Sequence, residues 1–382
     1  MTYEADVAVI GVGAVGSMTA WRLTERGLSV HAFEQFGVPN HRGASAGQTR
    51  RIAPFSLAAP ELTPTLTYSR TLWRDLERTS GHQLYVRTGG IILGPADTPD
   101  LVRLIRTAEE EGIRHDLLEP DALRARFPQH LVRDCDLGVW DELTGYLRPE
   151  LGILAAADAA RRGGAVIREY TPVTAVHPED RGVIVETGDE RLRFRWAVIA
   201  PGAWAEHLLP YRRPTIIPRL NPQAWYAPRD ISRYRAPAFA VFERVGDVKC
   251  YGFPTIDGAT VKIGISTDPH PPIADMKGRY PEVTAERLAD FSAVIARFFP
   301  GLHPTPVAVA AQPEGYSVDG HPFVGRLPDS PQVIAACGFS GAGYKSSPVT
   351  GEWIADLVAH GQSPWQLSRF DPKRSLTTGG AP

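Results

Sequence analysis

The hydrophobic pattern is clearest at the start of the chain, where two periods follow each other. Asp6–Gly11 (DVAVIG) is a short apolar run that enters a glycine turn, which is typical of a buried strand. A helix is predicted next, because apolar residues recur at helical spacing, namely Ala14, Met18 and Trp21. Leu28–Glu34 (LSVHAFE) predicts a second strand, parallel to the first by the handedness of such crossovers.

The rest of the chain carries weaker patterns of the same kinds. Apolar or alternating runs predict further strands at Val166–Ile167, Gly182–Thr187, Arg191–Ala200, Ala238–Glu243, Thr260–Ser266 and Gln332–Cys337. Helices are predicted at Leu101–Gly112, at Glu150–Arg162 after Pro149, and from the glycine turn Gly338–Gly343 through Leu357.

Strand-turn-helix units at both ends of the chain predict one nucleotide-binding domain assembled from separated segments. We expect an α/β fold with a Rossmann-like, cofactor-binding domain made of residues 1–85, 145–215 and 318–382. Residues 86–144 and 216–317 would form a second, α+β substrate domain that carries a mixed or antiparallel sheet.

Composition excludes several classes of function. Of the 382 residues, 43% are hydrophobic and 22% charged, which is ordinary for a soluble globular protein, and the net charge of −2 favours neither nucleic acid nor a membrane surface. No apolar run reaches the roughly 18 residues that span a bilayer, and the first residues lack the basic region of a signal peptide. Three distant cysteines, Cys135, Cys250 and Cys337, predict no disulfide framework and no metal site. We expect a monomeric cytoplasmic protein.

The first glycine turn carries a dinucleotide-binding motif. Gly11-Val12-Gly13-Ala14-Val15-Gly16 matches GxGxxG between a predicted strand and helix. Gly11 permits the tight turn, Gly13 lets the backbone approach a pyrophosphate, and Gly16 lets helix and strand pack closely. The helix N-terminus supplies N–H groups for the phosphates. Glu34 ends the second strand, where a carboxylate accepts hydrogen bonds from ribose hydroxyls and disfavours a 2′-phosphate.

The loop after the second strand bears on the choice between FAD and NAD. His41–Arg50 (HRGASAGQTR) stands where an NAD enzyme usually begins its next helix, and its small residues suit close approach to a flavin. Arg50 or Arg51 could face an anion. A solvated loop with charged ends explains the same residues equally well.

Lysine is rare in this chain, since Lys and Arg together number 41 and only five are lysine: Lys249, Lys262, Lys277, Lys345 and Lys373. A lysine kept in so arginine-rich a sequence hints at chemistry that arginine does not supply. A second glycine turn, Gly338–Gly343, begins a helix whose N-terminal dipole points at whatever the turn touches.

Several segments occur in the order seen in monomeric sarcosine oxidase: the N-terminal unit, the loop ending in Thr49-Arg50, Gly202-Ala203-Trp204, Tyr251-Gly252-Phe253-Pro254, Lys262, and Gly338–Lys345 (GFSGAGYK). Over nearly its whole length the chain resembles that family of D-amino-acid-oxidase-like FAD amine oxidases, which includes N-methyltryptophan oxidase. The resemblance implies an FAD domain in three segments and a substrate domain whose sheet lies over the flavin ring.

The resemblance also implies roles for individual residues. Lys262 matches the lysine beside the flavin that activates oxygen, and a fixed ammonium suits that task because it stabilises developing superoxide. Lys345 matches the lysine that binds the substrate carboxylate. Tyr251 matches a tyrosine near the substrate, although a half-buried strand aromatic explains it equally well. Arg50, Lys345 and Tyr251 would orient the substrate.

The expected FAD-binding residues come from the turns, the loop and the strand ends: Gly11, Gly13, Ala14, Val15, Gly16, Glu34, Gln35, Ala44, Ser45, Thr49, Arg50, Val173, Gly202, Trp204, Gly338, Ser340, Gly341, Gly343, Tyr344 and Lys345.

The chain departs from this family at three positions. The family attaches FAD through a cysteine seven residues before the aspartate that here is Asp319, and Gln312 stands at that position, so we expect non-covalent FAD and a core role for Cys337. Ala53 replaces the arginine that clamps the substrate carboxylate, a contact worth about 2 kcal/mol or more to a small substrate. Ser266 replaces an active-site histidine, which would leave a roomier site.

We therefore expect an oxidase that acts on a bulky secondary amine, such as an N-substituted glycine, in natural-product biosynthesis. Hydride transfer to flavin N5 would be followed by imine hydrolysis and by reoxidation by O₂ to H₂O₂. Alternatives are a flavin dehydrogenase with another acceptor, a glycine or D-amino-acid oxidase acting on a primary amine, an NAD-dependent dehydrogenase, and a non-catalytic flavoprotein subunit.

Overall fold

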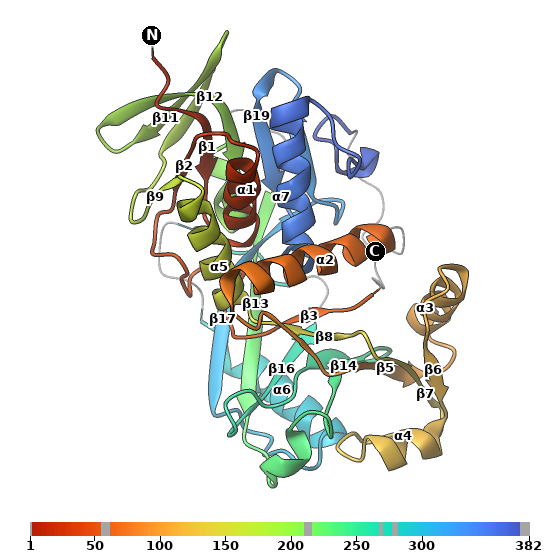
Figure 1. Cartoon of the computed structure of the whole chain (residues 1–382). Coiled ribbons are helices and arrows are strands. Elements are labelled where there is room, and N and C mark those ends of the chain that lie inside the picture. The colour runs from red at the N-terminus through yellow and green to blue at the C-terminus, as the bar shows by residue number, and fades with distance from the viewer. Residues whose placement is uncertain (1, 55–61, 210–215, 267–269, 277–281, 375–382) are drawn as a thin grey trace.

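The computed structural model describes residues 2–54, 62–209, 216–266, 270–276 and 282–374, which build two large mixed sheets covered by helices. One sheet lies with the N-terminus in the upper half of Figure 1 and the other lies in the lower half. This arrangement confirms the predicted α/β class and its second, mixed sheet.

The first sheet is built around the predicted β-α-β unit. β1 (Ala5–Ile10) pairs in parallel with β2 (Val30–Phe33) and with β12 (Glu190–Ile199), and β12 pairs in parallel with β19 (Ser330–Cys337). The remaining strands of the sheet are β9 (Val166–Arg168), β10 (Ala175–Glu179), β11 (Gly182–Thr187) and β18 (Phe323–Leu327). The carboxyl ends of β1, β2, β12 and β19 thus point the same way, which is where such sheets bind ligands.

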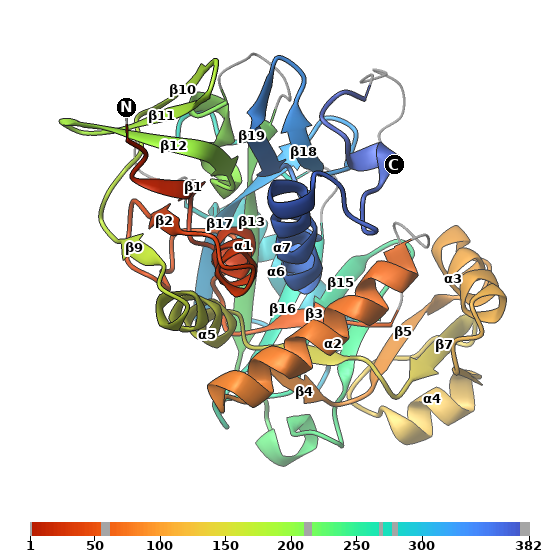
Figure 2. The same cartoon turned by 45° about the horizontal axis from the view of Figure 1, so that its top comes forward.

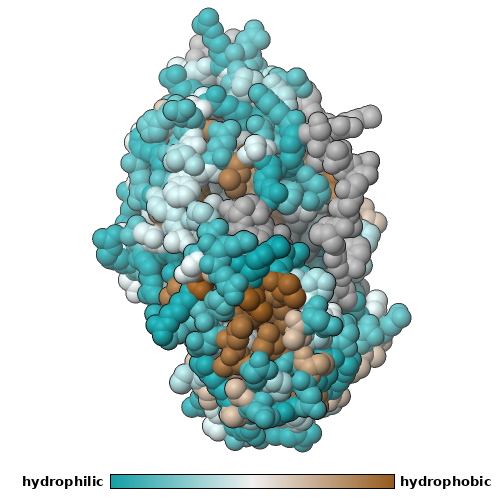
Figure 3. Space-filling model, turned by 90° about the vertical axis from the view of Figure 1, so that its right-hand side faces the viewer, coloured by the Kyte–Doolittle hydropathy of each residue, from teal (hydrophilic) through white to brown (hydrophobic). Residues whose placement is uncertain are grey.

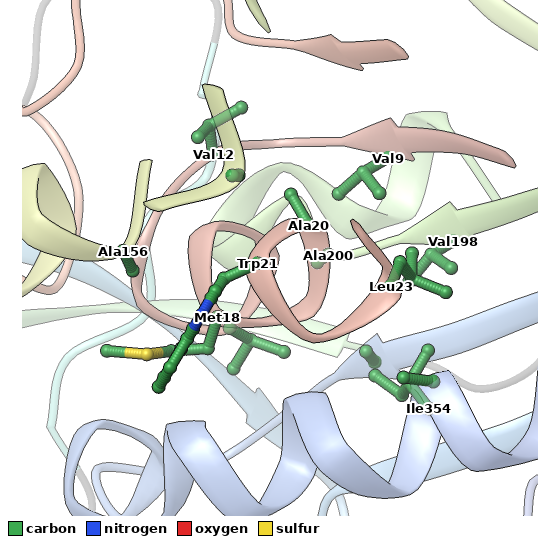
Figure 4. Packing of buried hydrophobic residues seen from close by; sticks show 14 of the residues in the cluster. Val9, Val12, Met18, Ala20, Trp21, Leu23, Ala156, Val198, Ala200 and Ile354 are labelled. Carbon is green, nitrogen blue, oxygen red and sulfur yellow. The ribbon is translucent and has the colours of Figure 1, made fainter. Parts of the chain in front are cut away.

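Helix α1 (Ala14–Glu25) is the centre of the core on one face of this sheet. Its residues Met18, Trp21 and Leu23 are buried among side chains of the sheet, of α5 (Pro149–Arg162) and of α7 (Gly343–His360), as Figure 4 shows. A Cβ added at Gly351 of α7 would lie 2.7 Å from the Met18 backbone, so α1 and α7 touch backbone to backbone. This contact joins the helices that follow the two glycine turns, and it fixes one turn relative to the other.

The second sheet has the order β17-β13-β16-β15-β14-β5-β7-β6 and is antiparallel except between β14 and β5. Its strands are β5 (Gly90–Pro95), β6 (Asp116–Leu118), β7 (Asp136–Asp141), β13 (Ile216–Tyr226), β14 (Val241–Arg244), β15 (Lys249–Gly252), β16 (Val261–Ser266) and β17 (Ala308–Ser317). Three helices lie around this sheet in the lower half of Figure 1: α3 (Pro99–Glu110), α4 (Pro120–Arg126) and α6 (Ala285–Phe298).

A small sheet, β3-β8-β4, joins the two halves through β3 (Arg50–Ile52), β4 (Tyr85–Arg87) and β8 (Gly145–Leu147). α2 (Thr63–Ser80) crosses the front of the molecule beside α7 and α5 in Figure 2. The predicted domain boundary after residue 85 falls inside β4, and the one after residue 215 adjoins residues 210–215, which lie outside the described residues. The boundaries stay predictions.

The sequence patterns did not predict α2 and α6, nor the long strands β13 and β17. β13 contains Pro218 and Pro222, which argue against a long strand. Both prolines pair with β17 on one side, whereas β16 pairs with β13 only from Gln223 to Tyr226 on the other. Residues 271–273 lie along that other edge of β13, where the Leu220 amide donates to the Pro271 carbonyl (3.0 Å) and the Ile273 amide donates to the Pro218 carbonyl (2.8 Å). The prolines are tolerated because neither of these contacts needs an N–H group from Pro218 or Pro222.

The right-hand side of the molecule carries an apolar area on its lower half (Figure 3). On that side α3 and β6 expose Val102 and Leu117. Among the described residues, no helix has the length and hydrophobicity needed to cross a bilayer.

Candidate active site

A cavity of about 700 Å³ opens at the carboxyl ends of the first sheet. Its wall comes from both glycine turns, the loop of residues 39–45, η2 (Gly202–His207) and the β17 residues Glu314 and Gly315. A volume of this size is typical of a cofactor or ligand site.

In the first glycine turn, each glycine stands where its expected steric role requires the absence of a side chain. Gly11 has φ +87°, and a Cβ there would lie 2.5 Å from the Ala200 carbonyl oxygen. A Cβ at Gly16 would lie 1.8 Å from the Gly11 carbonyl oxygen, so Gly16 serves packing and is absent from the cavity wall. At Gly13 no atom of the described residues lies within 4 Å of a Cβ position, and the residue is open to the cavity.

The N-terminus of α1 beside Gly13 is suited to phosphate. The helix has no side-chain cap and no acidic residue in its first turn, so its first N–H groups and its dipole are directed at the cavity. Glu34 lies at the same end of the sheet, 6% exposed, where its carboxylate accepts hydrogen bonds from the amides of Val12 (2.9 Å) and Phe36 (3.1 Å). Burial raises the pKa of Glu34, and the hydrogen bonds from the backbone oppose that rise. The carboxylate is therefore fixed in place, at the cavity wall.

The second glycine turn presents another helix N-terminus to the same cavity. Gly338, Ser340 and Gly341 have φ of +71°, +49° and +83°, and the Ser340 amide donates to the Gly315 carbonyl (3.2 Å). α7 begins directly afterwards, again with no side-chain cap and no acid in its first turn. Two helix dipoles thus converge on one cavity, which favours a ligand with negative charge at two places.

Lys262 joins β16 to the loop that precedes β3. Its side chain is buried, and its Nζ donates to the carbonyls of Gly47 (2.6 Å) and Thr49 (3.0 Å). Arg50 donates to the Thr49 carbonyl (2.7 Å) and to those of Ala44 and Ala46. Burial, and then the Arg50 charge, hold the pKa of Lys262 well below its usual range.

The two adjacent arginines of β3 have different surroundings, as alternation along a strand requires. Arg50 lines the cavity, whereas Arg51 lies 3.4 Å from Glu243 of β14. Lys345 lies near Arg51 and Glu243. Burial, and then the Arg51 charge, lower the pKa of Lys345 to about 8, and the Glu243 charge opposes that shift. Lys345 lines a small apolar pocket beside the main cavity, with Phe339 among its neighbours.

A polar network covers the face of the second sheet near the cavity. Asn221 of β13 donates to Glu314 of β17 (3.1 Å) and lies close enough to Tyr251 of β15 to lower the pKa of its hydroxyl slightly. The Tyr316 hydroxyl donates to the other oxygen of Glu314 (3.3 Å). Burial raises the pKa of Tyr251 to about 12, so its hydroxyl stays protonated at neutral pH.

Most predicted cofactor-binding residues line the cavity: Gly11, Gly13, Ala14, Val15, Glu34, Gln35, Ala44, Ser45, Arg50, Val173, Gly202, Trp204, Gly338, Ser340, Gly341, Gly343 and Tyr344. Gly16, Thr49, Lys345, Lys262 and Tyr251 do not line it. Tyr344 is also structural, because its hydroxyl donates to the Pro149 carbonyl (3.0 Å) and its ring stacks on Trp73. Lys277 lies outside the described residues.

The structure also places the three residues at which the chain departs from the family that it resembles. Ala53 is buried, and Ser266 is the exposed last residue of β16. Gln312 is buried on β17, and its side-chain oxygen has no hydrogen-bond partner in the part of the chain that the structure describes. Cys337 is fully buried in β19. Sequence reasoning missed Glu314, Phe36 and Met276 as wall residues, because none belongs to a glycine turn or a recognised motif.

Comparison with known proteins settles the family. The model of the FAD dependent oxidoreductase family matches residues 6–357. The chain belongs to this family. It is 31% identical to a monomeric sarcosine oxidase of Streptomyces avermitilis, over 98% of both chains. It is 30% identical to an N-methyl-L-tryptophan oxidase of Escherichia coli O139:H28, over 96% of this chain and 99% of that one. NikD, an amino acid oxidase of nikkomycin biosynthesis, shares the fold with a TM-score of 0.85 at 21% identity, over all of both chains.

As a member of this family the protein is an FAD-dependent oxidoreductase. The cavity fits FAD: α1 presents an uncapped N-terminus, Gly13 leaves its backbone open, and Glu34 offers a fixed carboxylate at the end of β2. The uncapped N-terminus of α7 supplies the second site for negative charge.

Proposed function

We propose that the protein is an oxidase that uses FAD to oxidise the C–N bond of an amine or amino acid, with O₂ as electron acceptor. The observation that carries this proposal is the buried ammonium of Lys262, held by two backbone carbonyls of the loop that reaches the cofactor cavity. Both relatives named above as sarcosine and N-methyl-L-tryptophan oxidases act on N-methyl amino acids according to their names, which supports the same class of substrate.

FAD would be held without a covalent bond. The α1 N-terminus and Glu34 would hold the pyrophosphate and the ribose, and the α7 N-terminus with Gly338–Gly341 would face the flavin ring. Gln312 has no thiol to offer, and Cys337 is buried with its pKa raised by burial to about 12, which keeps that thiol protonated and unreactive. Arg50, which hydrogen-bonds the loop carbonyls, would keep the loop in position beside the ring.

When bound, FAD supplies the two-electron acceptor for the hydride equivalent of the substrate C–H bond, and the imine product hydrolyses in water. The protein's own part is positioning and electrostatics. Lys262 would place a cation beside the site of oxygen reduction, where it stabilises developing negative charge. Lys345 and Arg51, which lie near each other, would bind the substrate carboxylate in place of the arginine that is Ala53 here.

The substrate we propose is a bulky N-substituted glycine or a related amino acid. Ala53 removes one long side chain from the site, and Glu243 partly neutralises Arg51, so a small carboxylate such as sarcosine gains less here than at a free arginine. A larger substrate recovers binding energy from apolar contacts. A role in natural-product biosynthesis and a monomeric state belong to the same proposal.

Purified protein tests the function directly. We expect a yellow preparation that releases peroxide with members of a panel of N-substituted glycines and cyclic secondary amino acids. Flavin that is reduced by an amine anaerobically but stays reduced in air would favour a dehydrogenase with another acceptor. A folded, colourless protein would contradict the proposal.

A further inference from the structure

Glu314 is a buried carboxyl group on the cavity wall with no ion-pair partner among the described residues. It lies on β17, 7% exposed. In the part of the chain that the structure describes, no Lys, Arg or His nitrogen lies within 4.0 Å of its oxygens. A buried carboxylate without a cation is costly, so the site calls for a ligand group that compensates it.

The cations nearest to Glu314 are directed elsewhere. Arg50 donates to three backbone carbonyls and Lys262 donates to two, all in the loop before β3. They act on Glu314 only through their charge. Burial raises the pKa of Glu314, and the charge of Arg50 with the hydrogen bonds from Asn221 and Tyr316 opposes that rise.

Glu314 is nonetheless held in one orientation. Asn221 donates to one carboxyl oxygen at 3.1 Å, and the Tyr316 hydroxyl donates to the other at 3.3 Å. A Cβ built on Gly341 would lie 3.7 Å from the Oε2 atom of Glu314, so the carboxyl group is directly opposite the second glycine turn. That turn is where we expect the flavin ring, and Asn221, which donates to Glu314, also lies near Tyr251.

We propose that Glu314 binds the ammonium group of the substrate and accepts one of its protons, so that the neutral amine is left beside the cofactor. This inference rests on the proposed function. The step is a proton transfer: an N–H bond of the ammonium breaks, an O–H bond forms on Glu314, and no electrons are exchanged. Desolvation favours it, because burial of an ammonium–carboxylate pair costs more than burial of the neutral pair.

The arrangement gives the substrate an orientation. Glu314 attracts the nitrogen, whereas Lys345 and Arg51, across β3 from Arg50, attract a carboxylate. Opposite charges in separate places select a zwitterionic amino acid over a simple amine or a simple acid.

The first test is equilibrium binding to the FAD-loaded protein. Ammonium chloride serves as the probe because it has no C–H bond to oxidise, and sodium chloride at equal ionic strength corrects for salt. We expect the Glu314→Gln variant to bind ammonium at least tenfold more weakly than the unaltered protein by calorimetry or by change in flavin absorbance. Glu314→Asp should restore part of the affinity, acetate should bind Glu314→Gln no less tightly, and Glu111→Gln, an exposed acid at the end of α3, should change nothing.

The second test is the pH dependence of the dissociation constant of a substrate amine that has no carboxylate, so that titration of Lys345 does not contribute, measured by anaerobic flavin reduction between pH 6 and 9. Unaltered protein takes up the protonated amine, so its affinity should change little over this range. Glu314→Gln can only bind the neutral amine, whose fraction rises tenfold with each pH unit, so its dissociation constant should fall by about that factor. The other charged or titratable groups around Glu314 are Arg50, Arg219, Tyr251, Lys262 and Tyr316.

Two results would overturn this inference. One is unchanged ammonium affinity together with a pH profile that Glu314→Gln does not alter, in a protein that still oxidises amines. The other is loss of FAD from Glu314→Gln with unchanged ammonium affinity, which would make Glu314 a cofactor ligand. If the unaltered, flavin-loaded protein oxidised no amine, that result would instead contradict the proposed function.

Discussion

Lys262 and Gly47 are 215 positions apart in the sequence, yet the lysine ammonium donates a 2.6 Å hydrogen bond to the glycine carbonyl. Gly47 has φ +105°, a conformation that side chains rarely adopt, and its carbonyl is held in reach of β16 by this backbone shape. The contact fixes the loop before β3 against the second sheet. It also leaves a buried cation close to where the flavin is expected.

This position of Lys262 predicts its effect on oxygen. We expect Lys262→Met to keep anaerobic flavin reduction by an amine but to slow reoxidation in air by about 100-fold or more, since one fixed charge at a developing anion is worth that much. Stopped-flow mixing of reduced enzyme with O₂ measures it. Lys249→Met is the matched control, because Lys249 is exposed on β15 and pairs with Asp100. Equal reoxidation rates in both variants would remove Lys262 from the oxidative step.

The depressed pKa of Lys262 gives a pH dependence of definite sign. Burial lowers this pKa, so the ammonium loses its proton below the range in which an exposed lysine does. The rate of reoxidation by O₂ should therefore fall as pH rises through the lowered pKa, and Lys262→Arg, whose guanidinium stays charged, should lack that fall. A profile that is flat in unaltered protein up to pH 10 would contradict this assignment.

Arg51, and not Arg50, is expected to help bind the substrate carboxylate. Arg50 is committed to loop carbonyls, whereas Arg51 lies beside Lys345 with Glu243 as its counter-ion. Arg51→Met should raise KM for an amino-acid substrate by about 10- to 30-fold, which corresponds to about 1.4–2 kcal/mol, and leave KM for an amine without a carboxylate nearly unchanged. Arg106→Met on exposed α3 is the control. Equal effects on both substrates would indicate a structural role.

Lys345 predicts that carboxylate binding weakens near pH 8. Its pKa is lowered to about 8, chiefly by burial, so the ammonium that attracts a carboxylate is lost as pH rises through that value. The affinity for acetate or for an amino-acid substrate should therefore decline above pH 8. Lys345→Arg should remove the decline because arginine does not titrate there. Titration of the unaltered protein and of Lys345→Arg with acetate between pH 6 and 9, followed by the absorbance of the bound flavin, measures the affinity of each.

Local sequence signals were enough for the parts of the site that local structure builds. Gly11, Gly13 and Gly16 specify a turn whose geometry follows from the missing side chains, and Glu34 follows from its place at the end of a short strand. The same holds for the second turn at Gly338, since a strand, a glycine run and a helix follow each other directly between Ser330 and His360.

Glu314 and Arg51 depend on pairing that no local pattern reveals. Glu314 faces the cavity because β17 runs beside β13 in a register that sets it opposite Arg219 and next to Asn221, and that register joins segments almost 100 residues apart. Arg51 points away from Arg50 because β3 pairs with β8, from the middle of the chain. Strand pairing of this range is fixed by tertiary packing, so single-sequence patterns do not predict it.

The attachment of FAD supplies the last prediction. Acid precipitation of the yellow protein should leave flavin colour in the supernatant, because Gln312 has no nucleophile and the Cys337 thiol is buried, with its pKa raised to about 12. Cys337→Ser should release its flavin in the same way, and Cys135→Ser, whose thiol is exposed, is the control for an adventitious thiol adduct. Colour that stays in the pellet of unaltered protein and leaves it in one of the two variants would identify that cysteine as the tether. Colour in every pellet would place a covalent bond at a residue other than cysteine 135 or 337.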